Sequence, residues 1–345
     1  MYATLASSTA AVKNARRLAL ASSTQSKASV SEQSLLVHQI CAEAGIWAPD
    51  AASRALEQSG GELGRAVALV RVWAATLPYA DAKTVSEDDI EITRHLSAAY
   101  AEIPGGQWLG PSDEQAPRLL TWLDHIDPVD VESERRSDLI AKTNSPGAVT
   151  SRRSDVRRVR DLIVEESTEP STPKGDGPDP TRAALTAPFS RLGRLAALAR
   201  SETGALVSFS SVVMESRREA ILLEINSSIV HFDVAHPRTG NQCRVSEVPI
   251  VEAEAVTDIL IDGRASLVLG YGVSLGSLER RAIAIAVLDA VLQDGPVTLT
   301  LDDGVITSAF DGLSATGIVE HLRLPHYVSF AAYLSSIENE EDLEQ

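Results

Sequence analysis

A strand, a glycine-rich turn and a helix are encoded in one stretch, Leu267-Val268-Leu269-Gly270-Tyr271-Gly272-Val273-Ser274-Leu275-Gly276-Ser277-Leu278-Glu279-Arg280-Arg281. Residues 267–272 have the composition of a strand that ends in glycine. Residues 277–292 have a strong helical pattern, since Leu278 and Ala282, and likewise Leu288 and Leu292, are four apart. The stretch therefore predicts a strand–loop–helix unit in the C-terminal half of the chain.

Two interpretations of the glycine loop remain open. Backbone N–H groups and the start of the helix could bind a phosphate, which would make Gly270, Tyr271, Gly272 and Arg280 substrate-binding residues. The glycines could instead permit only a β-bulge, while Glu279 and Arg280 cap the first helical turn. The spacing matches neither the dinucleotide-binding fingerprint nor a P-loop.

The composition of the rest of the chain changes twice, which divides it into a helical part, a polar stretch and a mixed part. Residues 3–126 predict helices, at 32–44, 51–58 and 62–77, with a further one that begins at the acidic run 86–89 and continues to 100. After a Ser-, Pro- and charge-rich stretch with a short helix at 156–166, a helix is expected at 189–200. Strands are expected at 205–214, 220–225, 229–234 and 297–301, a strand or helix at 248–260, and helices at 318–323 and 328–337.

These elements predict an α+β protein. Its parts are a helical N-terminal domain (1–127), a polar linker with one short helix (128–181), a mixed α/β domain with an antiparallel β meander (182–337) and an acidic tail (338–345). The mixed domain carries both the glycine loop and a pair of histidines.

Composition restricts the function. The 345-residue chain has a net charge of −17, which argues against general nucleic-acid or anionic-membrane binding. Its two cysteines, Cys41 and Cys243, imply no disulfide framework and fit a reducing compartment. The most apolar run, 282–292, is too short to span a bilayer. Residues 1–31 could mimic a transit peptide, although they fit an amphipathic helix better, so we expect a cytoplasmic protein.

The histidine pair lies in His321-Leu322-Arg323-Leu324-Pro325-His326-Tyr327. Pro325 disfavours helical angles at Leu324, so His321 and His326 could converge on one point and act as metal ligands. They could equally be structural. Two histidines fall short of the three or four protein ligands of a zinc site, so other parts of the chain or another chain would have to complete it.

Two further sets of residues could bind an anion. In the stretch 103–111, Gly105, Gly106 and Gln107 lie either in a tight helix connection or in a loop that approaches a ligand. Arg191 and Arg194 suit phosphate or phosphonate oxygens, but ion pairing with acidic residues is the alternative. A basic cluster (Arg152, Arg153, Arg157, Arg158 and Arg160) is either a solvated face or an anion site.

Three of these stretches together resemble the PhnI subunit of the bacterial carbon–phosphorus lyase core complex. They are 97–111, 270–280 and 321–327, and their order and separation match that family, as does the opening Met1-Tyr2. Two departures stand out. Ser7-Ser8-Thr9 replaces a Lys-Gly-Gly element of the family, and Glu224-Ile225-Asn226 replaces its Glu-Ile-Arg, without the preceding His-Pro.

The resemblance implies a cytoplasmic enzyme of phosphonate catabolism. With PhnG, PhnH and PhnL, such a subunit displaces adenine from ATP with an alkylphosphonate to give ribose 1-alkylphosphonate 5-triphosphate. Alone it would be a purine nucleosidase. It would form a homodimer, and His321 and His326 would contribute to a zinc site facing PhnJ. Glu279 becomes a candidate for purine protonation or for binding a ribose hydroxyl. A scaffold subunit with weakened catalysis and a free-standing nucleosidase are the alternative functions.

Overall fold

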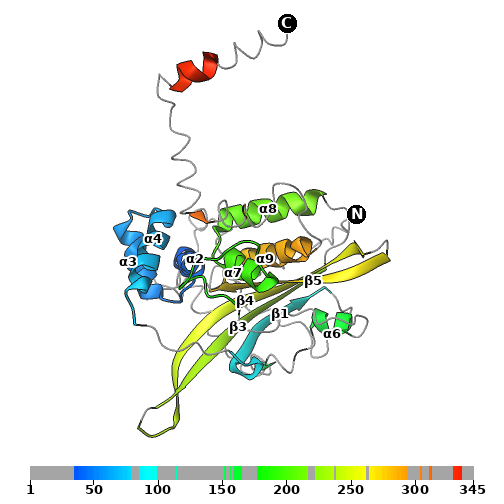
Figure 1. The fold of residues 1–345 in the computed structure, drawn as a ribbon. Helices are drawn as coiled ribbons and strands as arrows, with labels where there is room; N and C mark the ends of the chain where they lie inside the picture. Colours follow the sequence, from blue (N-terminus) through cyan, green and yellow to red (C-terminus); the bar gives the residue numbers. More distant parts are fainter. Residues whose placement is uncertain are drawn as a thin grey trace, which may run out of the picture.

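The computed structural model of the chain describes the following residues: 35–78, 85–98, 114, 151–152, 156, 158–164, 177–216, 222–236, 238–261, 264–293, 304, 311–312 and 329–335. They form a mixed structure in which helices cover a large antiparallel sheet (Figure 1). Within these residues no helix is long and apolar enough to cross a lipid bilayer.

The sheet has five strands in the order β2-β1-β3-β4-β5, and every neighbouring pair is antiparallel. The strands are β1 (Ile90–Ser97), β2 (Ser151–Arg152), β3 (Leu222–Ala235), β4 (Gln242–Ile261) and β5 (Arg264–Leu275). β3, β4 and β5 follow one another as an antiparallel meander, which is divided differently from the expected runs 205–214, 220–225 and 229–234. The sequence suggested 220–225 and 229–234 as separate strands. Residues 222–225 and 229–234 belong to the single long strand β3.

Helix α9 (Glu279–Leu292) lies across β4 and β5 and forms the centre of the main core. Its backbone comes so close to β5 that there is no room for a side chain at two positions. A Cβ atom on Gly270 would lie 2.0 Å from the carbonyl oxygen of Ala286, and one on Gly272 would lie 2.1 Å from that of Ala282. The opposing strand positions, Ala253 and Ala255, are small for the same reason.

Gly270 and Gly272 therefore lie in a strand, as expected for 267–272, and not in the loop that was considered as a phosphate site. Both glycines lie inside β5 and pair with β4, and their exposed backbone is covered by α9 rather than offered to a phosphate. The turn between β5 and α9 is made instead at Gly276, whose φ of +75° lies in the left-handed region. The strand and helix expected on either side of the turn are confirmed.

Two further helices pack against α9: α7 (Arg191–Ala199) and α8 (Thr203–Ser216). The prediction of a strand at 205–214 was wrong. Although the segment is rich in Val and Phe, its buried residues are Leu206, Ser210 and Val213, which are spaced as one face of a helix. Glu202 caps this helix by accepting hydrogen bonds from the backbone N–H groups of Gly204 and Ala205.

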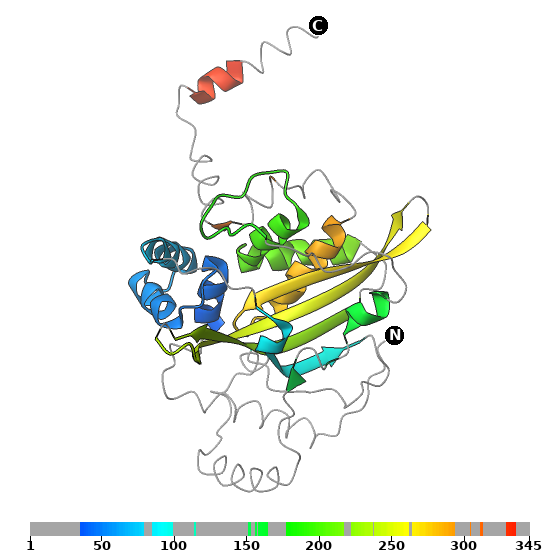
Figure 2. The same cartoon turned by 60° about the horizontal axis from the view of Figure 1, so that its bottom comes forward.

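Three helices form a smaller core of their own: α2 (Leu35–Ala44), α3 (Pro49–Gln58) and α4 (Leu63–Ala75). They confirm the helices expected at 32–44, 51–58 and 62–77. The unit contacts the end of the sheet (Figure 2). There the N–H of Ser277 donates to Nδ1 of His38 at 3.2 Å.

The helix expected from the acidic run 86–89 to residue 100 is absent. Ser86 and Asp89 form a capping box, but the turn ends after Glu87–Asp89 and the chain continues as β1. Ile90 and Ile92 are buried while Glu91 lies between them, so the burial period is two rather than 3.6. Because β1 pairs with β3, residues within 1–127 take part in the sheet of the C-terminal half.

A short helix within 128–181 is confirmed as α6 (Val159–Val164), which lies against the sheet. Residues 329–335 are helical, within the expected 328–337. The expectations for 1–31, 297–301, 318–323 and the tail 338–345 lie outside the described residues.

The contact between β5 and α9 gives a direct test of the fold. We expect Gly272→Ala to lower the free energy of unfolding by about 3 kcal/mol, because the new methyl group would meet helix backbone that cannot rotate away. Urea denaturation monitored by circular dichroism measures the change.

Gly193→Ala is the matched control. A Cβ at Gly193 would lie 3.4 Å from its nearest neighbour, an ordinary contact inside α7, so the expected change is within about 1 kcal/mol. Equal effects of the two substitutions would show that α9 does not approach β5 this closely.

Candidate functional site

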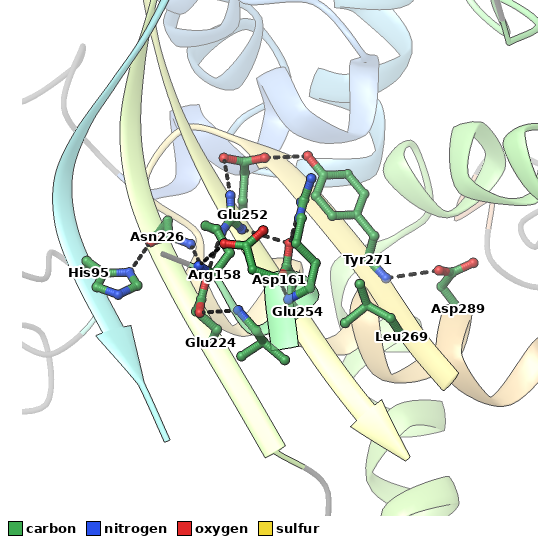
Figure 3. A network of polar contacts seen from close by, with 12 residues as sticks. His95, Arg158, Asp161, Glu224, Asn226, Glu252, Glu254, Leu269, Tyr271 and Asp289 are labelled. Carbon is green, nitrogen blue, oxygen red and sulfur yellow. Dashed lines mark hydrogen bonds and ion pairs between the residues drawn. The ribbon is translucent and has the colours of Figure 1, made fainter. Parts of the chain in front are cut away.

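The face of the sheet opposite α9 carries a group of buried polar side chains. Its members, which we call the polar centre, are Glu224 and Asn226 from β3, Glu252 and Glu254 from β4, and Tyr271 from β5 (Figure 3). The three glutamates and Asn226 are fully buried, with 0% relative exposure. Charged groups are rarely buried to this extent, so this is the most unusual chemical feature of the described chain.

Strand register brings these residues together. Glu224 lies directly opposite Glu254, and Asn226 lies directly opposite Glu252. On the other side of β4, Glu254 lies opposite Tyr271. Because side chains alternate along a strand, all five point to the same face, while Ala253, Ala255, Gly270 and Gly272 point to α9.

Apolar groups close the polar centre at both ends. On one side lie Ile90, Val230, Val248 and Ile250. On the other lie Val256 and Leu269 with Val159 of α6. The acidic side chains therefore lie between two apolar clusters on this face of the sheet, where the local dielectric constant is low and electrostatic interactions are strong.

Arg158, at the start of α6, is the central cation of this group. Its Nε donates to Glu224 at 2.6 Å, and its Nη2 and Nη1 lie 3.0 Å from Glu254 and 3.8 Å from Glu252. Burial disfavours the charged guanidinium, but the carboxylates of Glu254, Glu252 and Glu224 outweigh this effect and raise the pKa of Arg158. The arginine is thus fixed in its charged form.

The backbone of α6 and Arg160 add further contacts. The N–H of Val159 donates to Glu224 at 2.9 Å, and Nε of Arg160 donates to Glu254 at 2.6 Å. The guanidinium of Arg160 also lies 5.9 Å from the ring centre of Tyr271. Through these contacts the first turn of α6 is held on the sheet by charge rather than by apolar packing alone.

Hydrogen bonds extend the network to the remaining strands. The hydroxyl of Tyr271 donates to Glu252 at 2.5 Å, and the amide of Asn226 donates to Glu224 at 3.1 Å. Nδ1 of His95, on β1, lies 2.5 Å from the amide oxygen of Asn226. The network therefore spans four strands and one helix, and contains a carboxylate, a phenol and an imidazole as proton-carrying groups (Figure 3).

Charge counting shows what the arrangement can do. Three carboxylates face two guanidinium groups, so the group has a formal charge of −1. Like charges on directly paired strand positions are unfavourable, and they persist only where the arginines offset the repulsion. Buried acids near a phenol and arginines can transfer protons, stabilise a developing cation or recognise an anion once an arginine is released.

The structure places the predicted residues of the β5–α9 unit in different surroundings. Tyr271 belongs to the polar centre. Glu279 is buried at the start of α9 and accepts a hydrogen bond from Nε of Arg94 at 3.0 Å. Arg280 is largely exposed, and its backbone N–H donates to Glu114 at 2.9 Å. The structure thus places Tyr271 beside Glu252 in the polar centre and Glu279 beside Arg94.

Arg191 is paired within the fold. Its Nη2 donates to Asp289 of α9 at 2.7 Å and to the carbonyl oxygen of Leu269 at 2.8 Å. Asp289 also accepts the N–H of Tyr271 at 2.9 Å, so the pair covers the outer edge of β5. Arg194 donates to the carbonyl oxygen of Phe189. Arg191 therefore forms an ion pair with Asp289, which is the alternative that the sequence left open for Arg191 and Arg194.

The remaining predicted site residues cannot be compared with the structure. Gly105, Gly106, Gln107, His321 and His326 lie outside the described residues. Within the described part of the chain, no group of three or more His, Cys, Asp or Glu residues could hold a metal ion. His231 contacts Glu91 and Glu247, at 3.0 and 3.5 Å.

A second buried charge cluster joins the N-terminal helices to the main core. Arg281 of α9 is fully buried and donates to Thr203 at 2.7 Å, with Glu43 at 3.9 Å. Burial lowers the pKa of Arg281 to about 10, although Glu43 and Glu202 favour its charged form. Nearby, Arg71 binds Asp311 at 3.0 Å beside a cavity of about 300 Å³. The acidic residues of this second cluster already cap helices or pair with arginines, so the cluster serves as a structural junction.

Sequence reasoning missed the glutamates of the polar centre. The signal was present in Glu252-Ala253-Glu254-Ala255, where acids alternate with small apolar residues inside a strand. Such a pattern normally indicates a solvated face, and only the presence of α6 on that face reverses the conclusion. Arg158 and Arg160 were noted as members of a basic cluster, but their partners lie more than 60 residues away.

Comparison with known proteins identifies the family. Residues 1–343 match the model of the bacterial phosphonate metabolism protein PhnI. The chain belongs to the PhnI family. The resemblance seen in the three sequence stretches is thereby confirmed over the whole chain.

Three relatives of this PhnI chain are similar to it over most of their length. It is 30% identical to the alpha-D-ribose 1-methylphosphonate 5-triphosphate synthase subunit PhnI of Escherichia coli (strain K12), over 87% of this chain and 84% of the relative. It is 29% identical to the protein of the same name from Rhizobium meliloti (strain 1021), over 98% of this chain and 94% of the relative. The C-P lyase subunit protein HtxH of Stutzerimonas stutzeri is 30% identical, over 89% of this chain and 85% of the relative.

The polar centre of this PhnI chain should depend on Arg158. We expect Arg158→Met to lower the free energy of unfolding by about 3 kcal/mol or more, because it leaves three buried carboxylates without their shared cation. Chemical denaturation measures the loss, and Arg158→Lys should recover only part of it, since an ammonium cannot bridge several carboxylates as a guanidinium does.

Arg65→Met provides the control. Arg65 pairs with Glu62 at 3.6 Å on the surface, with side chains 80% and 54% exposed, so the expected change is within about 0.5 kcal/mol. An Arg158→Met protein as stable as the Arg65→Met protein would show that the polar centre does not need its arginine.

Proposed function

We propose that this chain is a subunit of the carbon–phosphorus lyase system, and that it takes part in displacing adenine from ATP by an alkylphosphonate. The observation that carries the proposal is the match to two relatives named as alpha-D-ribose 1-methylphosphonate 5-triphosphate synthase subunits. Both matches extend over at least 84% of each chain. The product is a ribose 1-alkylphosphonate 5-triphosphate, and with water in place of the phosphonate the same reaction is a purine nucleosidase reaction.

The reaction exchanges one bond at the anomeric carbon. The bond from C1′ to the purine nitrogen breaks, and its electron pair leaves with adenine, which takes up a proton. A phosphonate oxygen then forms the new bond to C1′. The developing ribosyl cation needs nearby negative charge, the departing purine needs an acid, and the anionic chains of ATP and phosphonate need arginine or backbone N–H groups.

We place this chemistry at the polar centre. Its carboxylates can stabilise a ribosyl cation, and the pair formed by Glu252 and the hydroxyl of Tyr271 can supply a proton. Arg158 and Arg160 offer planar guanidinium groups of the kind that bind phosphate and phosphonate oxygens. Gly105, Gly106, Gln107, Arg194 and Glu279 stay predictions as additional substrate contacts, from the sequence alone.

A scaffold subunit without catalysis is the second candidate. Two observations favour a scaffold: Glu224, Glu252 and Glu254 are fully buried, and they contact Arg158. Holding α6 on the sheet would be a sufficient role for such a network. On either reading the chain works in the cytoplasm as a homodimer with the PhnG, PhnH, PhnJ and PhnL subunits.

His321 and His326 are proposed as two ligands of a zinc ion completed by PhnJ. Imidazole is a common zinc ligand, and the proline between the two residues permits their side chains to converge. When bound, zinc would hold the two subunits together at that point.

Adenine release tests the function and its location. We expect the purified chain to release adenine from ATP, and to form ribose 1-methylphosphonate 5-triphosphate when methylphosphonate and the PhnG, PhnH and PhnL subunits are present. Glu252→Gln preserves the shape of the side chain but not its charge, and should slow release by about 100-fold or more. Chromatographic quantification of adenine and of the triphosphate product measures both.

Glu57→Gln, on the exposed surface of α3, should leave the rate unchanged. Wild-type protein that releases no adenine in any combination would support the scaffold function instead. Activity equal in wild type and in a folded Glu252→Gln protein would show that the chemistry lies elsewhere in the chain.

The zinc proposal has a separate test. The complex reconstituted with PhnJ should contain zinc by elemental analysis, and His321→Ala should remove it because one of the few ligands is lost. His125→Ala, at a histidine for which the sequence suggests no metal role, should retain it. Zinc content that is the same in both variants would exclude His321 as a ligand.

A further inference from the structure

Residues 329–335 form a short helix whose large apolar side chains share one face. Phe330, Tyr333 and Leu334 are three and four residues apart, and they are 47%, 61% and 44% exposed. The other residues of this helix are exposed as well, and in both views the helix stands apart from the body of the chain (Figures 1 and 2). A helix this short is not stable in water by itself, so its apolar face needs a surface that covers it.

The sequence around the helix contains no charge. Between Val328 and Ile337 there is no Asp, Glu, Lys or Arg, whereas charged residues make up 23% of the chain. A helix that faces water on all sides normally carries charged residues on its surface. The surface that covers this helix must therefore recognise it through apolar contact rather than through ion pairs.

Helices α3 and α4 form a groove with suitable walls, which we call the α3–α4 groove. Ala55 and Val70 line it and are buried, whereas Val72 and Trp73 line it and are 67% and 40% exposed. Its volume is about 640 Å³. Sites of about 300–1,000 Å³ accommodate a drug-sized group, so the groove has room for more than one large side chain.

The charges of the α3–α4 groove favour neither an anionic nor a cationic ligand. Asp50 and Arg54 are the charged residues that line it, and their charges are opposite. An uncharged helix with an aromatic face is thus the matching ligand, since aromatic side chains pack well against Trp73. A helix that presents anchors three and four residues apart is also the usual occupant of an apolar groove between helices.

The position of Asp311 places the start of the C-terminal segment next to this groove. Its carboxylate accepts hydrogen bonds from Nη1 of Arg71 at 3.0 and 3.1 Å, and Arg71 belongs to α4, the helix that carries Val72 and Trp73. Residues 313–328 join this point to the short helix, and a chain of that length can reach up to about 50 Å. Because α4 is only about 20 Å long and about 10–12 Å across, the groove of the same molecule is within reach.

We propose that the helix at 329–335 docks into the α3–α4 groove of its own chain. Phe330, Tyr333 and Leu334 then cover the exposed side chains of the groove. The same chain is the occupant because the connection through residues 313–328 gives an effective concentration on the order of 1 mM, far above that of a second copy in dilute solution. The inference does not depend on the proposed function.

Disulfide trapping in the full chain tests the contact. In a Cys243→Ser chain the remaining native thiol, Cys41, is buried, so Val72→Cys and Ala331→Cys supply the reactive pair. Ala331 lies three residues from Leu334 and so borders the apolar face. We expect these two thiols to form a disulfide within one chain at micromolar protein concentration, as measured by non-reducing electrophoresis and mass spectrometry.

Val212→Cys, combined with Ala331→Cys, is the matched control. Val212 lies on α8 and is 63% exposed, close to the 67% of Val72. It is also within reach of the same connection, since Gly312 lies beside Glu202, which caps α8. We expect the disulfide to form at least about 10-fold faster with Val72→Cys than with Val212→Cys.

Hydrogen exchange of the chain with its native cysteines gives a second measurement. Amide groups at 329–335 should exchange about 10-fold or more slowly in the wild type than in Phe330→Asp, which places a charge on the docked face. Ala332→Asp should keep the protection, because Ala332 lies two residues from both Phe330 and Leu334 and thus faces away from the groove. Circular dichroism shows whether each variant is folded.

The outcomes separate docking within one chain from the alternatives. Equal trapping rates with Val72→Cys and Val212→Cys, or exchange at 329–335 that is as fast in the wild type as in Phe330→Asp, would overturn the proposal. So would covalent dimers that form faster than the link within one chain when a Val72→Cys chain is mixed with an Ala331→Cys chain, since the occupant would then be a second copy. None of these measurements uses adenine release, so they decide the docking whatever the catalytic activity is.

Discussion

The contact between α9 and β5, which has no room for a Cβ atom, is the constraint on which the rest of the structure depends. Gly270 and Gly272 let the backbone of α9 lie directly on the strand, and this fixes which face of the sheet is apolar. Because side chains alternate, Tyr271 must then point to the opposite face, and the paired positions Glu252 and Glu254 must follow it. The location of the polar centre is thus a consequence of two glycines that do not belong to it.

Two buried arginines show how strongly the surroundings decide the properties of a charge. Arg158 faces three carboxylates, and their attraction exceeds the effect of burial, so the pKa of Arg158 is raised. Arg281 is buried as completely but has Glu43 only at 3.9 Å, and burial lowers its pKa to about 10. The first environment holds excess negative charge that a reaction or a ligand can use, whereas the second uses neutral hydrogen-bond partners to hold helices together.

Much of the helical structure could be predicted because its signals are local. The faces of α3, α4 and α9 repeat within a few residues, and the sequence placed these helices to within a few positions. Two failures have the same cause. Residues 90–97 and 205–214 have patterns that fit either period, and the choice was made by partners distant in sequence: β3 for the first and α9 for the second. Local propensity is a weak guide where tertiary contacts decide.

The candidate site could not be predicted for a related reason. A glutamate in a strand becomes unusual only when its face is covered, and the cover here is α6, whose Arg158 lies 66 residues from Glu224 in the sequence. The alternation of acidic and small residues within β4 therefore cannot show by itself whether the acidic face is buried or solvated, because the covering helix comes from a distant part of the chain.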